Sequence, residues 1–329
     1  MKPSFHAKLP NNPFEDPVLY VRLLREGRAM LFDSGFTVGL STRDILKITD
    51  IFVSHAHIDH FIGFDSILRL HLRREGSLKL YGPEGFISCV KGKLSSYTWN
   101  LTGDYPLVIE AYEVNNDILR KTVFKAKNSF VPEDSGSVPF NGVLLESSLF
   151  RVKGAVFDHR IPCLAFSLEE DYHINIDKAK LKALNLPVGP WLGELKKAIR
   201  EKRTDNAFTI DGNKWNYSEL KEIASITEGQ KLTYITDMLG SEENIEKAVG
   251  LAKNSDILYI ETYFLEKDKE RARERFHLTA KEAGRIAREA EVNRMETFHF
   301  SPKYMDDPDD LIREAEEEFN KFYTEKTNG

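Results

Sequence analysis

One short stretch restricts what this chain can fold into more than any other. Residues 53–60, VSHAHIDH, contain three histidines and an aspartate, between an apolar run ending at Phe52 and a segment whose apolar residues recur with helical spacing. The stretch is therefore expected to connect a strand to a helix. Alternate residues of extended backbone point to the same side, so His55 and His57 share one side, and Asp59 and His60 follow at the turn.

The residue types in this stretch indicate a metal site. Imidazoles and carboxylates without cysteine favour an open catalytic site for zinc or a related divalent ion over a closed structural one. The alternative is a solvated polar loop that holds histidines by chance. The whole chain has only nine histidines in 329 residues, which speaks against that alternative.

Three further ligand-type residues stand in the last positions of apolar runs. GAVFDH ends on His159, LTYITD ends on Asp237, and ETFHFS contains His299. Taken singly, a histidine at a strand end is more often an ordinary core or surface residue than a ligand. The joint occurrence of all three, in a chain that already contains the His55–His60 cluster, favours a metal centre assembled from several strand ends.

The composition indicates a soluble globular protein. Hydrophobic residues make up 41% of the chain and charged residues 30%, which allows a substantial core. No apolar run approaches the roughly 20 residues that span a bilayer, and the N-terminus lacks the apolar core of a signal peptide, so a cytoplasmic protein without membrane contact is expected. Cys89 and Cys163 lie in apolar surroundings without Cys-x-x-Cys spacing and are expected to be reduced core residues.

A basic insertion interrupts the strand-rich pattern at residues 171–226. Between 177 and 203 it carries eight lysines and arginines against three acidic residues, although the whole chain has a net charge of -6. Such local basicity favours binding to phosphates; the alternative is a solvated helical lid with scattered lysines. The chain closes with a predicted helix at 306–325, whose shared face contains Leu311, Ile312, Ala315, Phe319 and Phe322.

Several sequence elements, spread from about residue 18 to about residue 304, carry a resemblance to a known family. They are LFDSG, FVSHAHIDH, the LPVGPWLGELKKA segment of the insertion, SDILYIETYF followed by HLTAKEAGRIA, and HFSPKY. The histidine motif alone resembles the metallo-β-lactamase superfamily in general. Together the elements resemble one family within it, the ribonuclease Z family of tRNA 3′-processing endoribonucleases.

The resemblance implies a dinuclear zinc centre, in which manganese or iron could replace zinc. It assigns His55, His57 and His159 to one ion, Asp59, His60 and His299 to the other, and Asp237 to a bridging position.

The resemblance also implies roles around the metals. Asp59 would accept the proton of the attacking water, and Asp33 would orient a ligand histidine. His277, supported by Glu261, would stabilise charge or protonate the leaving 3′ oxygen. The plain alternative for His277 is a surface histidine beside the start of a helix, with Thr279 as the capping residue.

The implied fold is the metallo-β-lactamase-type four-layer αβ/βα sandwich, a single domain over residues 1–329 with an inserted helical basic arm at 171–226. In the family this arm grips the elbow of tRNA, and the implied homodimer lets one subunit's arm present the RNA to the other subunit's site. The implied substrate contacts are Gly189, Pro190, Lys196 and Lys197 in the arm and Lys303 in HFSPKY.

Two segments depart from the family pattern. LFDSGFTVGLST stands where the family has a Gly-Glu-Gly-Thr-Gln loop, and Thr236 and Met238 flank Asp237 where the family has glycine and threonine. Lys303 stands where the family usually has arginine, so a point charge replaces a forked donor.

The expected function is that of a zinc-dependent phosphodiesterase, an endoribonuclease that removes 3′ trailers from tRNA precursors through a hydroxide bridging the two metals. Two alternatives remain open. One is a hydrolase on the same scaffold that acts on cyclic nucleotides or other small phosphodiesters, and the other is a non-catalytic RNA-binding protein that uses the basic arm alone.

Overall fold

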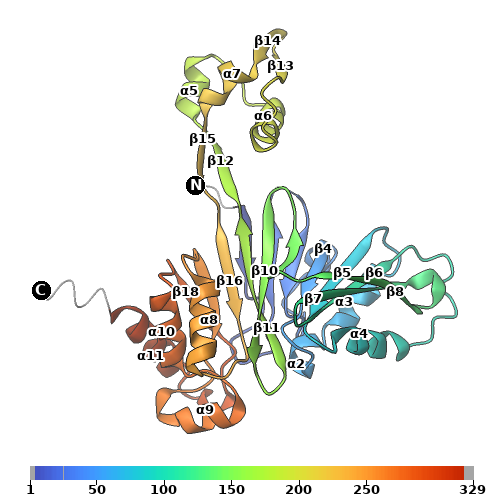
Figure 1. The fold of residues 1–329 in the computed structure, drawn as a ribbon, viewed down its shortest axis with the longest axis vertical. Coiled ribbons are helices and arrows are strands. Elements are labelled where there is room, and N and C mark those ends of the chain that lie inside the picture. Colours follow the sequence, from blue (N-terminus) through green and yellow to red (C-terminus); the bar gives the residue numbers. More distant parts are fainter. Residues whose placement is uncertain (1–3, 25, 322–329) are drawn as a thin grey trace, which may run out of the picture. The chain divides into compact units, whose positions relative to one another are not determined.

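The structure, a computed structural model, describes residues 4–24 and 26–321 and divides the chain into two compact units (Figure 1). The larger unit takes in Pro3–Leu145, Val152–Leu168 and Lys231–Gly329. The smaller one takes in Glu146–Arg151 and Glu169–Gln230. The insertion expected at 171–226 falls within the smaller unit.

An eight-stranded sheet forms the first half of the larger unit. Its strands follow chain order, and β2 pairs with β3 as an antiparallel hairpin. Strands β3, β4, β5 and β6 run parallel to one another, so the carboxyl ends of β3 and β4 meet at one edge. The strands are β1 (Phe5–Lys8), β2 (Leu19–Leu23), β3 (Ala29–Phe32), β4 (Ile48–Phe52), β5 (Ser77–Gly82), β6 (Val108–Asn115), β7 (Ile118–Lys125) and β8 (Pro132–Pro139).

A six-stranded sheet forms the second half, in the order β18-β17-β16-β11-β10-β9. Strands β16, β17 and β18 are parallel, which again brings their carboxyl ends to one edge. The strands are β9 (Val143–Glu146), β10 (Phe150–Asp158), β11 (Pro162–Glu170), β16 (Lys231–Ile235), β17 (Ile257–Glu261) and β18 (Met295–Phe298).

Aromatic side chains pack the two sheets against each other. The rings of Phe32 and Phe52 lie with their centroids 5.6 and 5.7 Å from that of Phe166 on β11, and the ring of Tyr234 on β16 lies 6.1 Å from Phe32. Burying four such rings removes a large apolar area from water and so contributes strongly to holding the sheets together.

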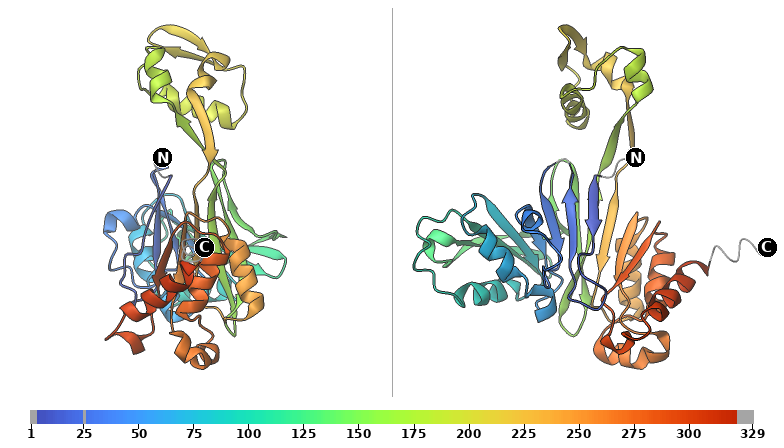
Figure 2. Two further views of the ribbon diagram at one scale, coloured as in Figure 1. Left: turned by 90° about the vertical axis from the view of Figure 1, so that its left-hand side faces the viewer. Right: turned by 180° about the vertical axis from the view of Figure 1, so that it is seen from behind.

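Helices cover the outer faces of both sheets (Figures 1 and 2). Helices α1 (Thr42–Ile45), α3 (Phe64–His71) and α4 (Phe86–Ser95) supply buried residues to the core of the first sheet. Helices α8 (Glu242–Ala252) and α10 (Ala280–Glu289) do so for the second, and α11 (Asp309–Phe319) packs on α10. The expected four-layer αβ/βα sandwich is therefore confirmed.

The smaller unit has a hydrophobic core of its own. Trp191 and Leu195 of α6 (Trp191–Arg200) pack with Leu181 of α5 (Lys178–Ala183) and Phe208 of β13 (Ala207–Ile210). The insertion is therefore a folded element with an apolar core.

The insertion was expected to be a helical arm, but it also contains strands. Strand β12 (Tyr172–Ile176) pairs with β15 (Ala224–Glu228), and β13 pairs with β14 (Asn213–Asn216) through a turn at Asp211–Gly212. Both turn residues have positive φ, as a tight hairpin requires. The segments of β12 and β15 lie far apart in the sequence, so local patterns could not reveal their pairing.

Cys163 is buried, but the prediction for Cys89 was wrong, because Phe86, Val90 and Leu94 form the buried face of α4 and leave Cys89 exposed. The predicted C-terminal helix is α11, whose Leu311 and Ala315 are buried; Phe322, expected on the same face, lies outside the described residues.

Gly63, which follows the His55–His60 stretch, packs tightly against Ser34 and Gly35, which follow β3. Its N–H donates to the carbonyl oxygen of Ser34 over 2.8 Å. A Cβ atom at this position would lie 2.0 Å from the carbonyl oxygen of Gly35. Because the obstructing atom belongs to the backbone, a side chain here must push the segments apart.

We predict that Gly63→Ala lowers the free energy of unfolding by about 1–3 kcal/mol, the usual cost of overpacking. Gly92→Ala in α4 is the matched control, since no described atom lies within 4 Å of its added Cβ. It should be neutral or stabilise by up to about 1 kcal/mol, because glycine is a poor helix former. Urea denaturation of both variants checks this; equal stability of the two would contradict the predicted clash.

Candidate metal centre

The expected ligands meet where the strands of both sheets end. His55 follows β4, His159 follows β10, Asp237 follows β16 and His299 follows β18. Asp59 and His60 lie in the short helix α2 (Ile58–Phe61), which His57 precedes. Carboxyl ends of parallel strands share an edge, which is why residues so distant in sequence can gather there.

Three of these strand ends adopt a backbone conformation that is uncommon outside glycine. The φ angles of Asp33, Asp237 and His299 are 57°, 48° and 58°. Aspartate and histidine tolerate this left-handed region better than most residues, and such conformations concentrate at functional sites. At each of these positions the chain turns sharply where its strand ends.

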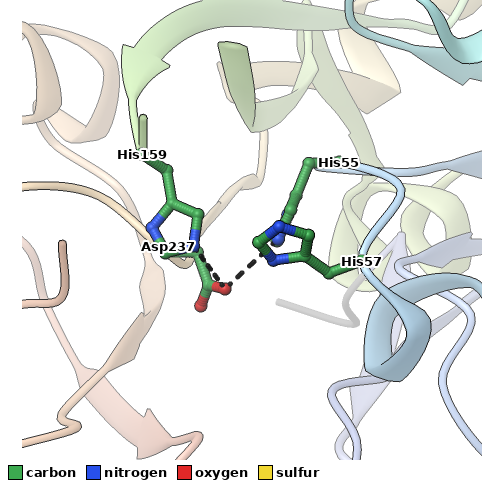
Figure 3. Close-up of side chains that lie close together, drawn as sticks. All are labelled: His55, His57, His159 and Asp237. Carbon is green, nitrogen blue, oxygen red and sulfur yellow. Dashed lines mark ion pairs between the residues drawn. The ribbon is translucent and has the colours of Figure 1, made fainter. Parts of the chain in front are cut away.

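The side chains form three groups in which each residue offers a ligand atom within 4.8 Å of the others. The first group joins His55, His57, His159 and Asp237 (Figure 3). The second joins Asp59, His60 and His299, and the third joins Asp237, Glu261, His277 and His299. The first two groups correspond to the two ligand sets implied by the resemblance, with Asp237 reaching both through His60 and His299.

Asp33 receives hydrogen bonds from several directions beneath the centre. Its carboxylate accepts the Ser54 N–H at 2.6 Å, the Ser54 hydroxyl at 2.9 Å, the Tyr234 hydroxyl at 2.8 Å and the Nδ1–H of His60 at 2.8 Å. The Ser54 oxygen in turn lies 3.1 Å from Nδ1 of His55, which can donate to it. Both imidazoles are thus oriented from behind through Nδ1.

This orientation leaves the opposite ring nitrogens facing the centre. Nε2 of His55 and Nε2 of His60 are buried and have no hydrogen-bond partner within the described part of the chain. His159 is held in the same way, because its Nδ1 donates to the carbonyl oxygen of Phe276 over 2.8 Å. Histidine ligands of metals characteristically donate their second N–H to a carboxylate or carbonyl, so the side chains present fit a metal centre.

The carboxylate of Asp237 organises the charges of the centre. Burial alone would raise the pKa of Asp237, but the surrounding histidines, first His299 and then His60, hold it well below its ordinary value. Burial lowers the pKa of His60 and of His299, and the neighbouring carboxylates, above all Asp237, raise both well above the ordinary value. The buried carboxylates therefore favour positive charge beside Asp237, either as a proton on an imidazole or as a bound cation.

His277 stands beside the ligands and is held by two neighbours. Its Nδ1 donates to Oε2 of Glu261 over 2.9 Å, and its ring stacks on Tyr263 at 3.9 Å between centroids. The other Glu261 oxygen accepts the backbone N–H groups of Met238 and Leu278. Burial would raise the pKa of Glu261, but His277 and its hydrogen bond keep the pKa lowered, so the group is an anion that fixes the imidazole.

The remaining predicted site residues lie elsewhere. The Lys303 ammonium contacts Oδ1 of Asp268 at 2.5 Å, so its charge is already paired. Gly189, Pro190, Lys196 and Lys197 belong to the smaller unit, at the start of α6 and along it. Lys197 is exposed and lies 3.9 Å from Glu201.

Several residues that shape the centre were not found from the sequence. Ser54 and Tyr234 both bind Asp33, and Tyr263 stacks on His277. Ser54 directly precedes the histidine motif and Tyr234 lies three positions before Asp237, which were the only local signals. Hydroxyl groups and aromatic rings carry no ligand signature, so only the folded chain reveals their contacts.

None of the helices within residues 4–24 and 26–321 has the length and apolar character needed to cross a membrane.

Comparisons with known proteins agree with the geometry. The profile of the metallo-beta-lactamase superfamily matches residues 14–71. Ribonuclease Z of Nanoarchaeum equitans is 30% identical over 285 residues, which cover 84% of this chain and 76% of that protein. Ribonuclease Z of Picosynechococcus is 30% identical over 313 residues, which cover 92% and 86%.

A solved structure, the short form of human tRNase Z, superposes with a TM-score of 0.53 at 19% identity and covers 92% of each chain, which supports the fold. On the sequence identity and coverage of its relatives, the chain belongs to the ribonuclease Z family of the metallo-β-lactamase superfamily.

Proposed function

We propose that this chain is a metal-dependent endoribonuclease that removes 3′ trailers from tRNA precursors. The observation that carries the proposal is the convergence of histidines on one buried carboxylate, in a member of the ribonuclease Z family. The Nε2 atoms of His55 and His60 lie 3.4 and 3.2 Å from Asp237 and make no hydrogen bond among the described residues. We propose zinc as the metal, with two ions per subunit. His55, His57 and His159 would hold one, Asp59, His60 and His299 the other, and Asp237 would be shared.

When bound, the two ions would activate water and neutralise charge on the phosphoryl group. The chain's own residues supply the proton transfers. Burial would raise the pKa of Asp59, but hydrogen bonds from His299 and His60 hold the pKa far below its ordinary value, so Asp59 is an anion. With its side chain partly exposed beside the centre, it is placed to accept a proton from the attacking water.

His277 is suited to the opposite transfer. Cleavage breaks the bond between phosphorus and the 3′ oxygen, which needs a proton to leave as a hydroxyl group, while the trailer keeps the phosphate. Glu261 holds Nδ1 of His277 and leaves Nε2 as the donor. With the ring fixed through Nδ1, a proton carried on Nε2 can pass to the 3′ oxygen as negative charge develops there.

The smaller unit supplies the features expected of an RNA-binding element. Its basic segment has an apolar core that keeps α5 and α6 folded, so that exposed side chains such as Lys197 can meet phosphates on a stable surface. Phosphate binding of this kind needs no base recognition, which suits a substrate class of shared shape and varied sequence. We further propose that the protein acts as a homodimer in the cytoplasm.

We predict that His57→Ala lowers the bound zinc of the purified protein from about two ions per chain to one or fewer. Cleavage of a tRNA precursor should fall by more than about 100-fold, since even the loss of outer partners of a metal costs about 10- to 100-fold. His6→Ala is the matched control, because both histidines are exposed and His6 lies in β1. Elemental analysis and product mapping measure both; unchanged zinc in the His57 variant would contradict the assignment.

His277→Gln should separate two substrates. Cleavage of the precursor should fall by about 100- to 10,000-fold, the usual contribution of a proton donor. Hydrolysis of bis(p-nitrophenyl) phosphate should change little, because p-nitrophenolate leaves without a proton. Equal losses on both substrates together with lowered zinc would show that His277 is a ligand instead, as its membership in the third group allows.

Replacing residues 177–223 by Asn-Gly tests the arm. Ile176 and Ala224 are paired neighbours in β12 and β15, so a two-residue turn can close the remaining hairpin. We expect the kcat/KM for a tRNA precursor to fall by about 100-fold or more through lost phosphate contacts. Hydrolysis of bis(p-nitrophenyl) phosphate and the zinc content should be retained. Unchanged precursor cleavage would remove the arm from the proposed function.

A further inference from the structure

Two exposed apolar side chains lie on neighbouring segments beside the metal centre. Phe36 is 55% exposed and Ile58, between the ligands His57 and Asp59, is 74% exposed. Among the described residues, Phe36 and Tyr97 are the aromatic members of the exposed large hydrophobic side chains. A single exposed apolar side chain is ordinary on a protein surface, so the exposure of Phe36 does not by itself indicate a role.

The backbone that leads to Phe36 lies directly against the ligand segment. The Ser34 N–H donates to the carbonyl oxygen of His60 over 2.9 Å. A Cβ atom on Gly35 would lie 2.5 Å from the carbonyl oxygen of Asp59. Phe36 therefore directly follows a residue whose backbone approaches that of Asp59, and Ile58 precedes Asp59 on the other segment.

A second segment, residues 10–16, holds the backbone of Phe36 on both sides. The Phe36 N–H donates to the Asp16 carboxylate over 3.2 Å, and the Phe36 carbonyl oxygen accepts from the Asn11 side chain at 2.8 Å. The same Asn11 amide also donates to the carbonyl oxygen of Asp16.

The segment 10–16 is itself tied to the centre, since the N–H of Phe300, next to His299, donates to the carbonyl oxygen of Pro13 over 2.7 Å. The ring of Phe14 also packs edge-on against that of Phe300, with centroids 5.5 Å apart. Phe36 thus presents an exposed ring from a backbone anchored to both ligand-bearing loops. An aromatic ring on a backbone that is already held loses less conformational entropy on binding a ligand than one on a loose segment.

We propose that Phe36, flanked by Ile58, is a stacking platform for the base of a nucleotide next to the scissile phosphate. This inference rests on the proposed function, which brings a ribonucleotide chain to the metal centre. Phe36 is two residues from Ser34 and one from Gly35, whose backbones contact His60 and Asp59, so a base that flanks a phosphate held at the centre would pass close to this segment. Every base has a π face, so an aromatic ring binds it whatever the sequence, as a substrate class of varied sequence requires.

The test pairs a change in the protein with a change in the RNA. Precursors carrying one abasic nucleotide, placed in turn on each side of the cleavage site, are cleaved by the wild-type protein and by three variants. Phe36→Leu keeps apolar area but removes the ring, Phe36→Tyr keeps the ring, and Tyr97→Leu is the matched control at the other exposed aromatic residue.

At one position, the abasic substitution should lower the wild-type kcat/KM by about tenfold, a typical effect of losing one base–aromatic stack. The Phe36→Leu protein should cleave the intact precursor with a kcat/KM lowered by about the same factor. On that abasic RNA its kcat/KM should equal that of the wild-type protein. Phe36→Tyr and Tyr97→Leu should behave as wild type. Zinc content and thermal unfolding of Phe36→Leu should match wild type, since the side chain is exposed and lies outside the core.

The platform would be overturned if the effects of Phe36→Leu and of the abasic nucleotide on kcat/KM multiplied at every position tested. It would also be overturned if no abasic nucleotide lowered cleavage by the wild-type protein. Either result would leave the proposed function intact. A wild-type protein that carries zinc but cleaves no tRNA precursor would overturn the proposed function, and the platform with it.

Discussion

The buried carboxylate of Asp237 is the interaction on which the rest of the centre depends. Its oxygens lie 2.8 to 3.8 Å from ring nitrogens of five histidines that come from both sheets: His55, His60, His159, His277 and His299. A buried anion is costly unless it is compensated, and the imidazoles are the compensation that the fold provides. The two sheets must therefore end at one edge, because otherwise these rings could not surround one carboxylate.

Asp33 has a complementary role at the end of β3 in the first sheet. It binds Ser54, His60 and, across the interface between the sheets, Tyr234. One carboxylate thereby couples the orientation of a ligand to the packing of the two sheets. The close approach of Gly63 to Gly35 and the hydrogen bonds of the segment 10–16 to Phe36 connect further segments to those that carry Asp33 and His60.

The two compact units divide the work of the proposed enzyme. The larger unit contains all the side chains assigned to metals and proton transfer, and the smaller unit contains the basic segment and an independent apolar core. In the proposed function, phosphate binding by the smaller unit would depend on charge and therefore on salt, whereas the chemistry in the larger unit would depend on buried geometry. This separation is why exchanging the arm for a short turn can test binding without disturbing the centre.

The sequence alone determined the kind of chemistry and most of the fold. Dense spacing predicted His55, His57, Asp59 and His60 as ligands, and periodicity predicted individual strands and helices, because both signals lie within short windows of the chain. The layered arrangement of these elements was implied by the family resemblance. The positions of His159, Asp237 and His299 at the ends of apolar runs added these three residues to the predicted ligands. Local pattern was misleading for Cys89, which falls off the buried face of its helix, and for the strands of the arm.

Only the tertiary structure decided how these residues meet. It brought Ser54 and Tyr234 to Asp33, stacked Tyr263 on His277, turned Asp237 and His299 through a left-handed backbone conformation, and left Phe36 exposed beside Asp59. The contacts of Asp33 with Ser54 and Tyr234, and of Tyr263 with His277, join residues from different segments of the chain. Which pairs form depends on the packing of whole sheets, and no local spacing in a sequence records that packing.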